Sequence, residues 1–112
     1  MPILQHDLFP FTHYEYGEAY YGSYRGMRYR IAREPLKNVR YDPPEERKNG
    51  KLVVSIWKEP LAYNKTPADQ IHHTEFDFTE EAFLKIADFL NQYWEQHRQD
   101  WPQSENYGFR ES

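Results

Sequence analysis

Apolar and polar side chains alternate in three stretches of the chain, and this period of two is the spacing of β-strands. Residues 24–34 form the first stretch, whose apolar face carries Met27, Tyr29 and Ile31. Residues 51–59 have apolar side chains on both faces, which favours a central strand. Residues 71–78 alternate strictly, which is typical of a half-buried strand. The pattern therefore predicts an antiparallel sheet.

Prolines and a polar turn separate these strands. Pro35 follows the first strand and Pro60 follows the second, and proline has no amide hydrogen to give to a strand. Residues 36–41 are expected to add a short piece of strand. Residues 42–50 form a polar turn that ends in Asn-Gly, a pair common where a tight turn leads into a strand. We therefore expect three to four strands, with a hairpin closed by this turn.

A helical period replaces the strand period after Thr79. The Thr79 hydroxyl is suited to cap the helix, and Glu80 and Glu81 stand in the first turn, where the helix dipole favours negative charge. The helix is expected to run to about residue 98. One apolar stripe follows its length, made of Phe83, Ile86, Ala87, Leu90, Trp94 and His97. The fold class is therefore predicted as α+β, with one long C-terminal helix packed on one face of the sheet.

The length of 112 residues fits a single domain with one modest core. We divide it into an aromatic N-terminal arm (1–21), the sheet with its helix (22–98) and a polar tail (99–112). The aromatic residues of the arm follow neither a helical nor a strand period. They are expected either to cover the edge of the sheet as a lid or to contact a partner. The candidates for partner contact are Tyr14, Tyr16, Tyr20 and Tyr21.

Composition narrows the classes of function. The absence of cysteine excludes disulfides, thiolate metal sites and a cysteine nucleophile. No apolar run reaches the ~20 residues of a membrane span, and the N-terminus lacks the pattern of a signal peptide, so we expect a cytoplasmic protein without a membrane partner. The net charge of −4 is unevenly divided. Residues 1–56 have nine basic and seven acidic side chains, and residues 57–112 have five and eleven.

An arginine cluster on the first strand is the first candidate site, and Arg28 and Arg30 project from one face about 7 Å apart. Such a pair can hold a phosphate or a carboxylate. The alternative, which we favour, is that Glu34, Glu75 or Asp77 pairs with these arginines across the sheet. Tyr24 and Tyr29 would also suit single-stranded nucleic acid, although the overall charge makes direct nucleic-acid binding the weaker hypothesis. The candidate anion-binding residues are Arg25, Arg28, Arg30 and Arg33.

Acidic side chains gather around the start of the helix and along its outer side. They are either an ordinary solvated surface or an array that imitates the phosphates of a nucleic acid before a nucleic-acid-binding protein. As candidate partner contacts we take Glu75, Asp77, Glu80, Glu81, Asp88 and Glu95.

Evidence for catalysis or for a cofactor is lacking in the sequence. His72 and His73 are adjacent strand residues that point to opposite faces, so they are poorly placed to share a metal ion. His97 lies on the apolar stripe and is expected to bond to the backbone at the edge of the core. No serine stands in a nucleophile turn, and no glycine-rich phosphate loop is present. We therefore expect no metal and no cofactor, and we favour a binding protein over an enzyme.

Four segments carry a resemblance to a known group of proteins: Gly-Met-Arg-Tyr-Arg-Ile-Ala-Arg-Glu-Pro-Leu at 26–36, Ile-Trp-Lys-Glu-Pro at 56–60, Phe-Asp-Phe-Thr-Glu-Glu at 76–81 and Phe-Leu-Asn-Gln-Tyr at 89–93. Over residues 20–98 the chain resembles short bacterial proteins of phage and other mobile elements, some of which are labelled GNAT acetyltransferases. The Arg/Gln-x-x-Gly-x-Gly/Ala motif that binds acetyl-CoA in acetyltransferases does not occur here. A mobile-element origin instead implies an inhibitor of host defence, of the anti-CRISPR kind.

Three hypotheses follow. The first is a non-enzymatic protein that occupies the surface of a partner, such as a nucleic-acid-guided nuclease complex. The second is a small acetyltransferase, which only the resemblance suggests. The third is a single-stranded nucleic-acid binder that uses the arginine-rich strand. The sequence leaves the oligomeric state open.

Overall fold

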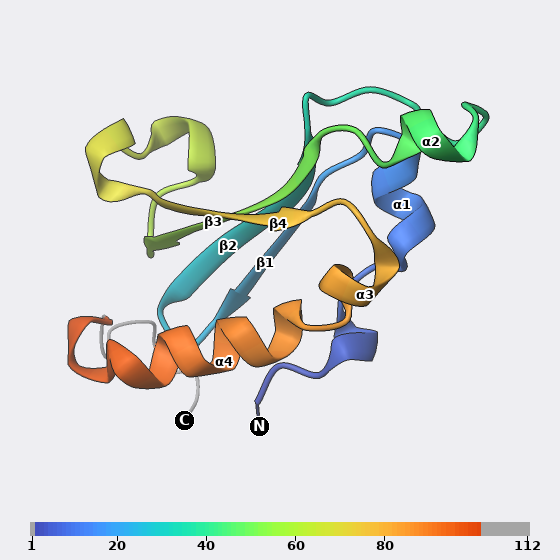
Figure 1. Cartoon of the computed structure of the whole chain (residues 1–112). Helices are drawn as coiled ribbons and strands as arrows, with labels where there is room; N and C mark the ends of the chain where they lie inside the picture. The colour runs from blue at the N-terminus through green and yellow to red at the C-terminus, as the bar shows by residue number, and fades with distance from the viewer. Residues whose placement is uncertain (1, 102–112) are drawn as a thin grey trace.

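A four-stranded antiparallel sheet organises the chain in the computed structural model, which describes residues 2–101 (Figure 1). The strands follow one another in the order β1-β2-β3-β4. Their bounds are β1 Tyr20–Tyr24, β2 Met27–Glu34, β3 Lys51–Lys58 and β4 His72–Asp77. The predicted α+β class and antiparallel sheet are confirmed, and most of the predicted polar tail lies outside the described residues.

The first predicted strand is in fact two strands joined by a tight turn. Arg25 and Gly26 form the turn, with φ angles of 46° and 90°, and the flanking Tyr24 and Met27 face each other. Positive φ at both central residues gives the twist that a two-residue hairpin requires. The predicted strand is therefore present from Met27 to Glu34, and the turn before it was missed because arginine is a rare residue at positive φ.

The connection from β2 to β3 also differs from expectation. Residues 36–41 contain no strand, and the polar segment that follows holds the short helix α2, Pro44–Arg47. The two strands still pair as a hairpin, from Glu34 opposite Lys51 to Met27 opposite Lys58. β3 lies between β2 and β4 and is buried along both faces, so its predicted central position is confirmed.

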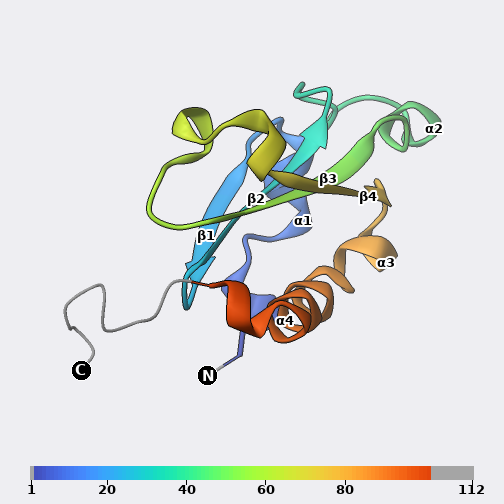
Figure 2. The same ribbon diagram turned by 90° about the vertical axis from the view of Figure 1, so that its left-hand side faces the viewer.

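Helices α3 (Glu80–Phe83) and α4 (Ile86–Gln96) cover one face of the sheet, which we call the inner face (Figures 1 and 2). The Thr79 hydroxyl accepts a hydrogen bond from the Ala82 amide at 3.1 Å, so the predicted cap is confirmed. A break at residues 84–85 divides the predicted single helix. The predicted stripe faces the sheet and is buried at Phe83, Ile86, Ala87 and Leu90, and half-buried at Trp94 and His97.

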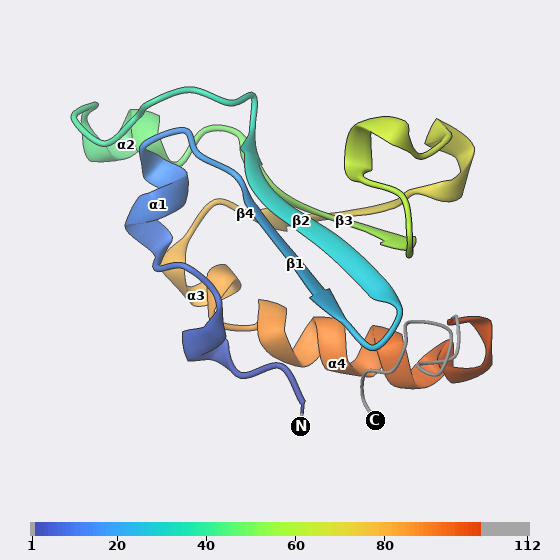
Figure 3. The same cartoon turned by 180° about the vertical axis from the view of Figure 1, so that it is seen from behind.

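The N-terminal arm is more regular than expected. It contains the helix α1, Phe11–Glu15, and its last two residues begin β1. Its first residues lie along the helix layer rather than over the sheet edge, since Ile3 exchanges two backbone hydrogen bonds with the Asn91 amide (Figure 3). Short 3₁₀ turns complete the described chain at Gln5–Asp7, Tyr63–Lys65, Ala68–Gln70 and Arg98–Asp100. Within residues 2–101, the helices lack the length and apolar character to cross a bilayer.

Candidate anion-binding site

The four arginines of the predicted cluster occupy three different places. Arg25 is exposed in the β1–β2 turn. Arg33 shares the inner face with Met27, because both positions have the same parity along β2. Arg28 and Arg30 project from the opposite side, which we call the outer face. The structure therefore keeps the predicted pair together and removes the other two arginines from the cluster.

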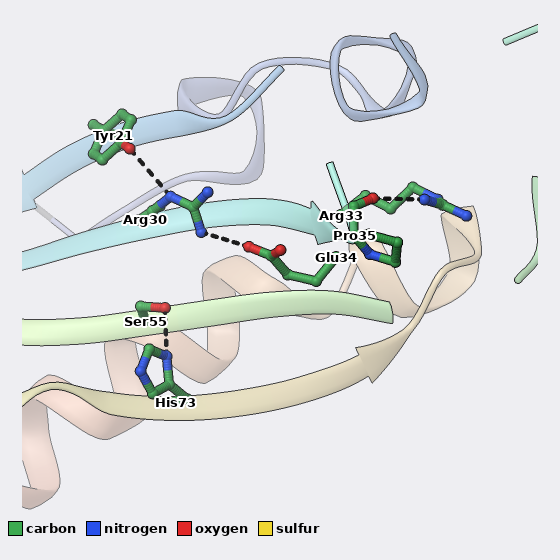
Figure 4. A network of polar contacts seen from close by, with 7 residues as sticks. All are labelled: Tyr21, Arg30, Arg33, Glu34, Pro35, Ser55 and His73. Atoms are coloured by element: carbon green, nitrogen blue, oxygen red, sulfur yellow. Dashed lines mark hydrogen bonds and ion pairs between the residues drawn. The ribbon is translucent and has the colours of Figure 1, made fainter. Parts of the chain in front are cut away.

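Arg33 is part of the scaffold. Its side chain is 3% exposed, and its guanidinium donates a hydrogen bond to the carbonyl of Pro35 (Figure 4) and another to the carbonyl of Asn49. The guanidinium carbon also lies 5.3 Å from the centre of the Phe78 ring. These contacts tie together the two ends of the β2–β3 connection. Because the side chain is buried and two of its donors serve backbone carbonyls, Arg33 is not open to an external anion, although its Nε has no partner within residues 2–101.

Arg30 is also engaged within the protein. It donates to the Glu34 carboxylate at 2.9 Å and to the Tyr21 hydroxyl at 3.1 Å, and it stacks 5.0 Å from the centre of the Tyr63 ring (Figure 4). Burial lowers the pKa of Arg30, but the hydrogen bonds to Glu34 and Tyr21 outweigh it, so the pKa is raised overall. The favoured prediction of pairing is thus confirmed for Arg30, with Glu34 as its acid.

Arg28 differs from both neighbours. It stands opposite Ser23 of β1 and Trp57 of β3, and neither residue is charged. Among residues 2–101, no carboxylate forms an ion pair with it, and its buried Nε atom has no hydrogen-bond partner. The predicted acids are elsewhere, since Asp77 pairs with Lys51 at 3.0 Å and Glu75 stands opposite Val53. Arg28 therefore differs from Arg30 and Arg33, each of which donates two guanidinium hydrogen bonds to oxygens of the protein.

A pocket of about 530 Å³ opens around Arg28. The segment after β3 folds back over the outer face and is held there by a 2.7 Å hydrogen bond from the Trp57 indole to the Leu61 carbonyl. This places the Tyr63 ring 5.3 Å from Trp57 and 6.3 Å from Tyr21. The polar atoms nearby come from Ser23 and Asn64. The pocket thus combines one cation with aromatic walls and small polar groups.

This combination suits a carboxylate or phosphate on an apolar or flat stem. The volume falls within the range of ordinary ligand sites, and such sites join mainly apolar walls to a few polar anchors. A guanidinium binds carboxylates and phosphates through paired N–H donors that lie in one plane. Lysine lacks this planar pair of donors. Arg28 was predicted from sequence, but Trp57 and Tyr63 were not. The position of Trp57 on the same face of the hairpin as Arg28 was the available signal in the sequence. Nothing in the sequence indicated that the segment around Tyr63 folds back over this face.

A second, smaller pocket of about 250 Å³ lies between the inner face and the end of α4. The His97 ring stacks on Tyr93 at 4.1 Å, and its Nδ1 lies 2.9 Å from the Tyr93 carbonyl, so its predicted backbone bond is confirmed. His72 packs against Tyr93, whereas His73 meets the Ser55 hydroxyl on the outer face at 2.8 Å. The two histidines therefore point to opposite faces, as predicted. The described part of the chain holds no cluster of three side chains able to bind a metal ion.

The four tyrosines predicted to contact a partner differ in solvent exposure. Tyr14 is fully buried in the core, so it is not a surface contact, and burial raises the pKa of its hydroxyl. Tyr20 is half-buried between Phe9 and Tyr29. Tyr16 and Tyr21 are exposed by 43% and 56%. Only the last two tyrosines of this set present a ring that a partner could reach.

The predicted acidic residues are all exposed but do not form one array. Glu75 and Asp77 project from the outer face of β4, because their neighbours His72 and Phe76 contact the helix layer. The others lie on that layer, on the far side of the sheet: Glu80, Glu81, Asp88 and Glu95. The helix and strand groups therefore face different directions, and a single partner surface would meet only one of them.

Comparison with known protein families, curated proteins and solved structures finds no match to this chain. The resemblance to proteins of mobile elements therefore stays a prediction, and the functional argument rests on the residues around Arg28.

Proposed function

We propose that the protein is a non-enzymatic binding module that holds an acidic group of a protein partner at Arg28. The observation that carries this proposal is the half-buried guanidinium of Arg28, which has neither an ion pair nor a hydrogen-bond partner among the described residues, whereas those of Arg30 and Arg33 donate to protein oxygens. A buried donor without a partner costs about 1–3 kcal/mol. The Nε itself is covered by the protein, so an occupant with anionic oxygens would bind the terminal N–H groups of Arg28, which no described residue engages.

Binding without catalysis is supported by the lining of the pocket. It contains no histidine, aspartate, glutamate, lysine or cysteine, so its Ser23 hydroxyl has no base within the lining to activate it as a nucleophile. Its aromatic walls, from Tyr21, Trp57 and Tyr63, instead supply contact area. Tyrosine and tryptophan provide such area at small entropic cost, and they are enriched where proteins bind one another.

A protein partner is favoured over nucleic acid by the charges. A nucleic-acid strand gains affinity from several cations that follow its phosphates. Arg30 and Arg33 are engaged internally, and Glu75 and Asp77 stand on the same outer face as Arg28. One isolated cation on a protein of net charge −4 suits one carboxylate better than a phosphate backbone. That the partner is a nucleic-acid-guided nuclease stays a prediction from the resemblance.

The proposal is tested by nuclear magnetic resonance with a minimal probe, N-acetyl-glutamate N-methylamide. We expect saturable shifts of the Arg28 Nε–H and Trp57 indole N–H signals at millimolar probe, weakening as salt rises. The glutamine analogue, which lacks the charge, should produce much smaller shifts.

Two variants serve as controls. Arg28→Gln should abolish the response, whereas Arg98→Gln should retain it, because Arg98 is exposed and pairs with Glu95 on another part of the molecule. Equal shifts with the charged and neutral probes, or an unchanged response in Arg28→Gln, would refute the proposal.

A further inference from the structure

The free edge of the sheet at β1 lies next to the Arg28 pocket. β1 pairs with β2 on one side, and within residues 2–101 no strand pairs with its other side (Figures 1 and 3). In a two-residue hairpin the pair that flanks the turn is hydrogen-bonded, and the bonding then alternates along the ladder. Starting from Tyr24 opposite Met27, this alternation directs the N–H and C=O groups of Tyr21 and Ser23 toward the open edge.

The composition of β1 is unusual for an edge. Exposed edge strands are normally protected by charged residues or proline, which discourage pairing with other chains. β1 reads Tyr-Tyr-Gly-Ser-Tyr and contains neither. The opposite edge, β4, carries Glu75 and Asp77. The two edges therefore differ, and β1 is the one left open to another strand.

We infer that β1 receives an extended acidic segment of the partner, which adds to the sheet as an antiparallel fifth strand and places a Glu or Asp side chain on Arg28. This inference rests on the proposed function and identifies the form of the partner. Segments that add to a sheet edge gain affinity from main-chain hydrogen bonds and specificity from alternate side chains.

The register explains how the acid reaches its arginine. Ser23 stands directly opposite Arg28, and a residue added opposite Ser23 would lie two strand spacings, about 10 Å, from Arg28. Side chains of residues opposite one another point to the same face, so the acid and Arg28 would both lie on the outer face. The small Ser23 between them leaves room for a glutamate and an arginine to meet above it.

Charge also decides between a partner segment and a second copy of this chain. Pairing of two β1 strands would bring two Arg28 side chains to one edge without adding a carboxylate from β1. An acidic segment supplies the missing charge. We therefore commit to an acidic extended peptide as the occupant.

The test uses the peptide Thr-Val-Glu-Val-Thr, acetylated and amidated, with the intact protein. The peptide can form two further main-chain hydrogen bonds, to Tyr21, that the single-residue probe is too short to form, so it should bind about tenfold tighter, and the amide signals of Tyr21 and Ser23 should shift. Methylation of the glutamate nitrogen should remove this gain. Methylation of the following valine nitrogen, which points away from β1, is the matched control and should preserve it.

Substitutions of Ser23 test the same main-chain hydrogen bonds by changing the protein instead of the peptide. Ser23→Pro removes the outward N–H and leaves the pairing with β2 intact, whereas Ser23→Ala retains that N–H. The proline variant should bind the peptide no better than the single-residue probe, and the alanine variant should bind it as the native protein does. If Ser23→Pro does not fold, the methylated peptides decide the question alone.

The outcomes test acid binding at Arg28 and strand addition at β1 separately. If the single-residue probe shifts Arg28 but the peptide gains nothing, or glutamate methylation has no effect, the strand-addition inference is overturned while the proposed function stands. If neither ligand affects Arg28, the proposed function fails as well. A dimer that forms through β1 without peptide would identify a second copy as the occupant and overturn the inference.

Discussion

Replacement of Arg28 and of Arg33 by methionine, one at a time, should change stability in opposite directions although the two arginines lie on one strand. Methionine keeps the length of the side chain and removes the guanidinium. In Arg33→Met, the carbonyls of Pro35 and Asn49 lose their donors in a region where Arg33 is 3% exposed. Each lost hydrogen bond contributes about 0.5–1.5 kcal/mol, and removal of the unpartnered Nε of Arg33 offsets part of the loss, so we expect a loss of about 1–2 kcal/mol.

Arg28→Met removes a donor that has no partner among the described residues. The guanidinium is only half-buried, so the relief is at the low end of the about 1–3 kcal/mol that an unsatisfied buried group costs, and the free energy of unfolding should stay equal or rise by about 1 kcal/mol. Urea unfolding followed by tryptophan fluorescence measures both changes, provided that the dependence on urea concentration is the same in all three proteins. The native protein is the common reference.

The comparison refutes the reasoning in either of two ways. If Arg28→Met destabilises the protein as much as Arg33→Met does, Arg28 belongs to the scaffold and the proposed site loses its anchor. If Arg33→Met costs less than about 1 kcal/mol, the carbonyls do not depend on the guanidinium, and the division of the arginines into scaffold and site is wrong.

Three further changes test the scaffold by chemical denaturation or pH titration. Gly22→Ala should cost about 1–3 kcal/mol, because a Cβ there would lie 2.6 Å from the buried Tyr29 ring; a neutral effect would show that the ring can yield. Tyr14→Phe should keep or raise stability, since the buried hydroxyl has no partner within residues 2–101; a loss above about 1 kcal/mol would contradict this. Burial raises the pKa of Tyr14 and Tyr29 above the ordinary 10.0, so the stability that depends on their neutral hydroxyls is intact below pH 10.0 and is lost as the pH rises further. Ultraviolet titration should show two tyrosines that ionise only when the protein unfolds. Thr79→Ala should cost about 1 kcal/mol through loss of the cap.

The segments with the clearest periodic spacing of apolar side chains were predicted well. β3, β4 and the helix after Thr79 each have an uninterrupted pattern and a clear start or stop, and each is present. The hairpin turn at Arg25 was missed because the usual Asn-Gly or Asp-Gly was absent, although Tyr24 and Met27, three residues apart, already break the period of two. Helix α1 was missed because its five residues are too few to establish a period.

The site was only partly accessible from sequence. Alternation placed Arg28 and Arg30 on one face, and the same alternation places Arg33 beside Met27 on the other, a signal that the grouping of the arginines overlooked. Glu34 shares the outer face with Arg30 four residues along β2, and only the long arginine side chain brings the two charges together. The walls of the pocket could not be predicted, because Tyr63 reaches the outer face only through the return of an irregular segment fastened by Trp57.

The central claim is that Arg28 is held free to bind an acidic group, and the Arg28 Nε–H signal reports on it directly. Titration of the labelled protein with N-acetyl-glutamate N-methylamide should move that signal to saturation, and equal additions of the glutamine analogue should leave it nearly in place. A signal that responds to neither compound, or to both alike, would contradict the claim.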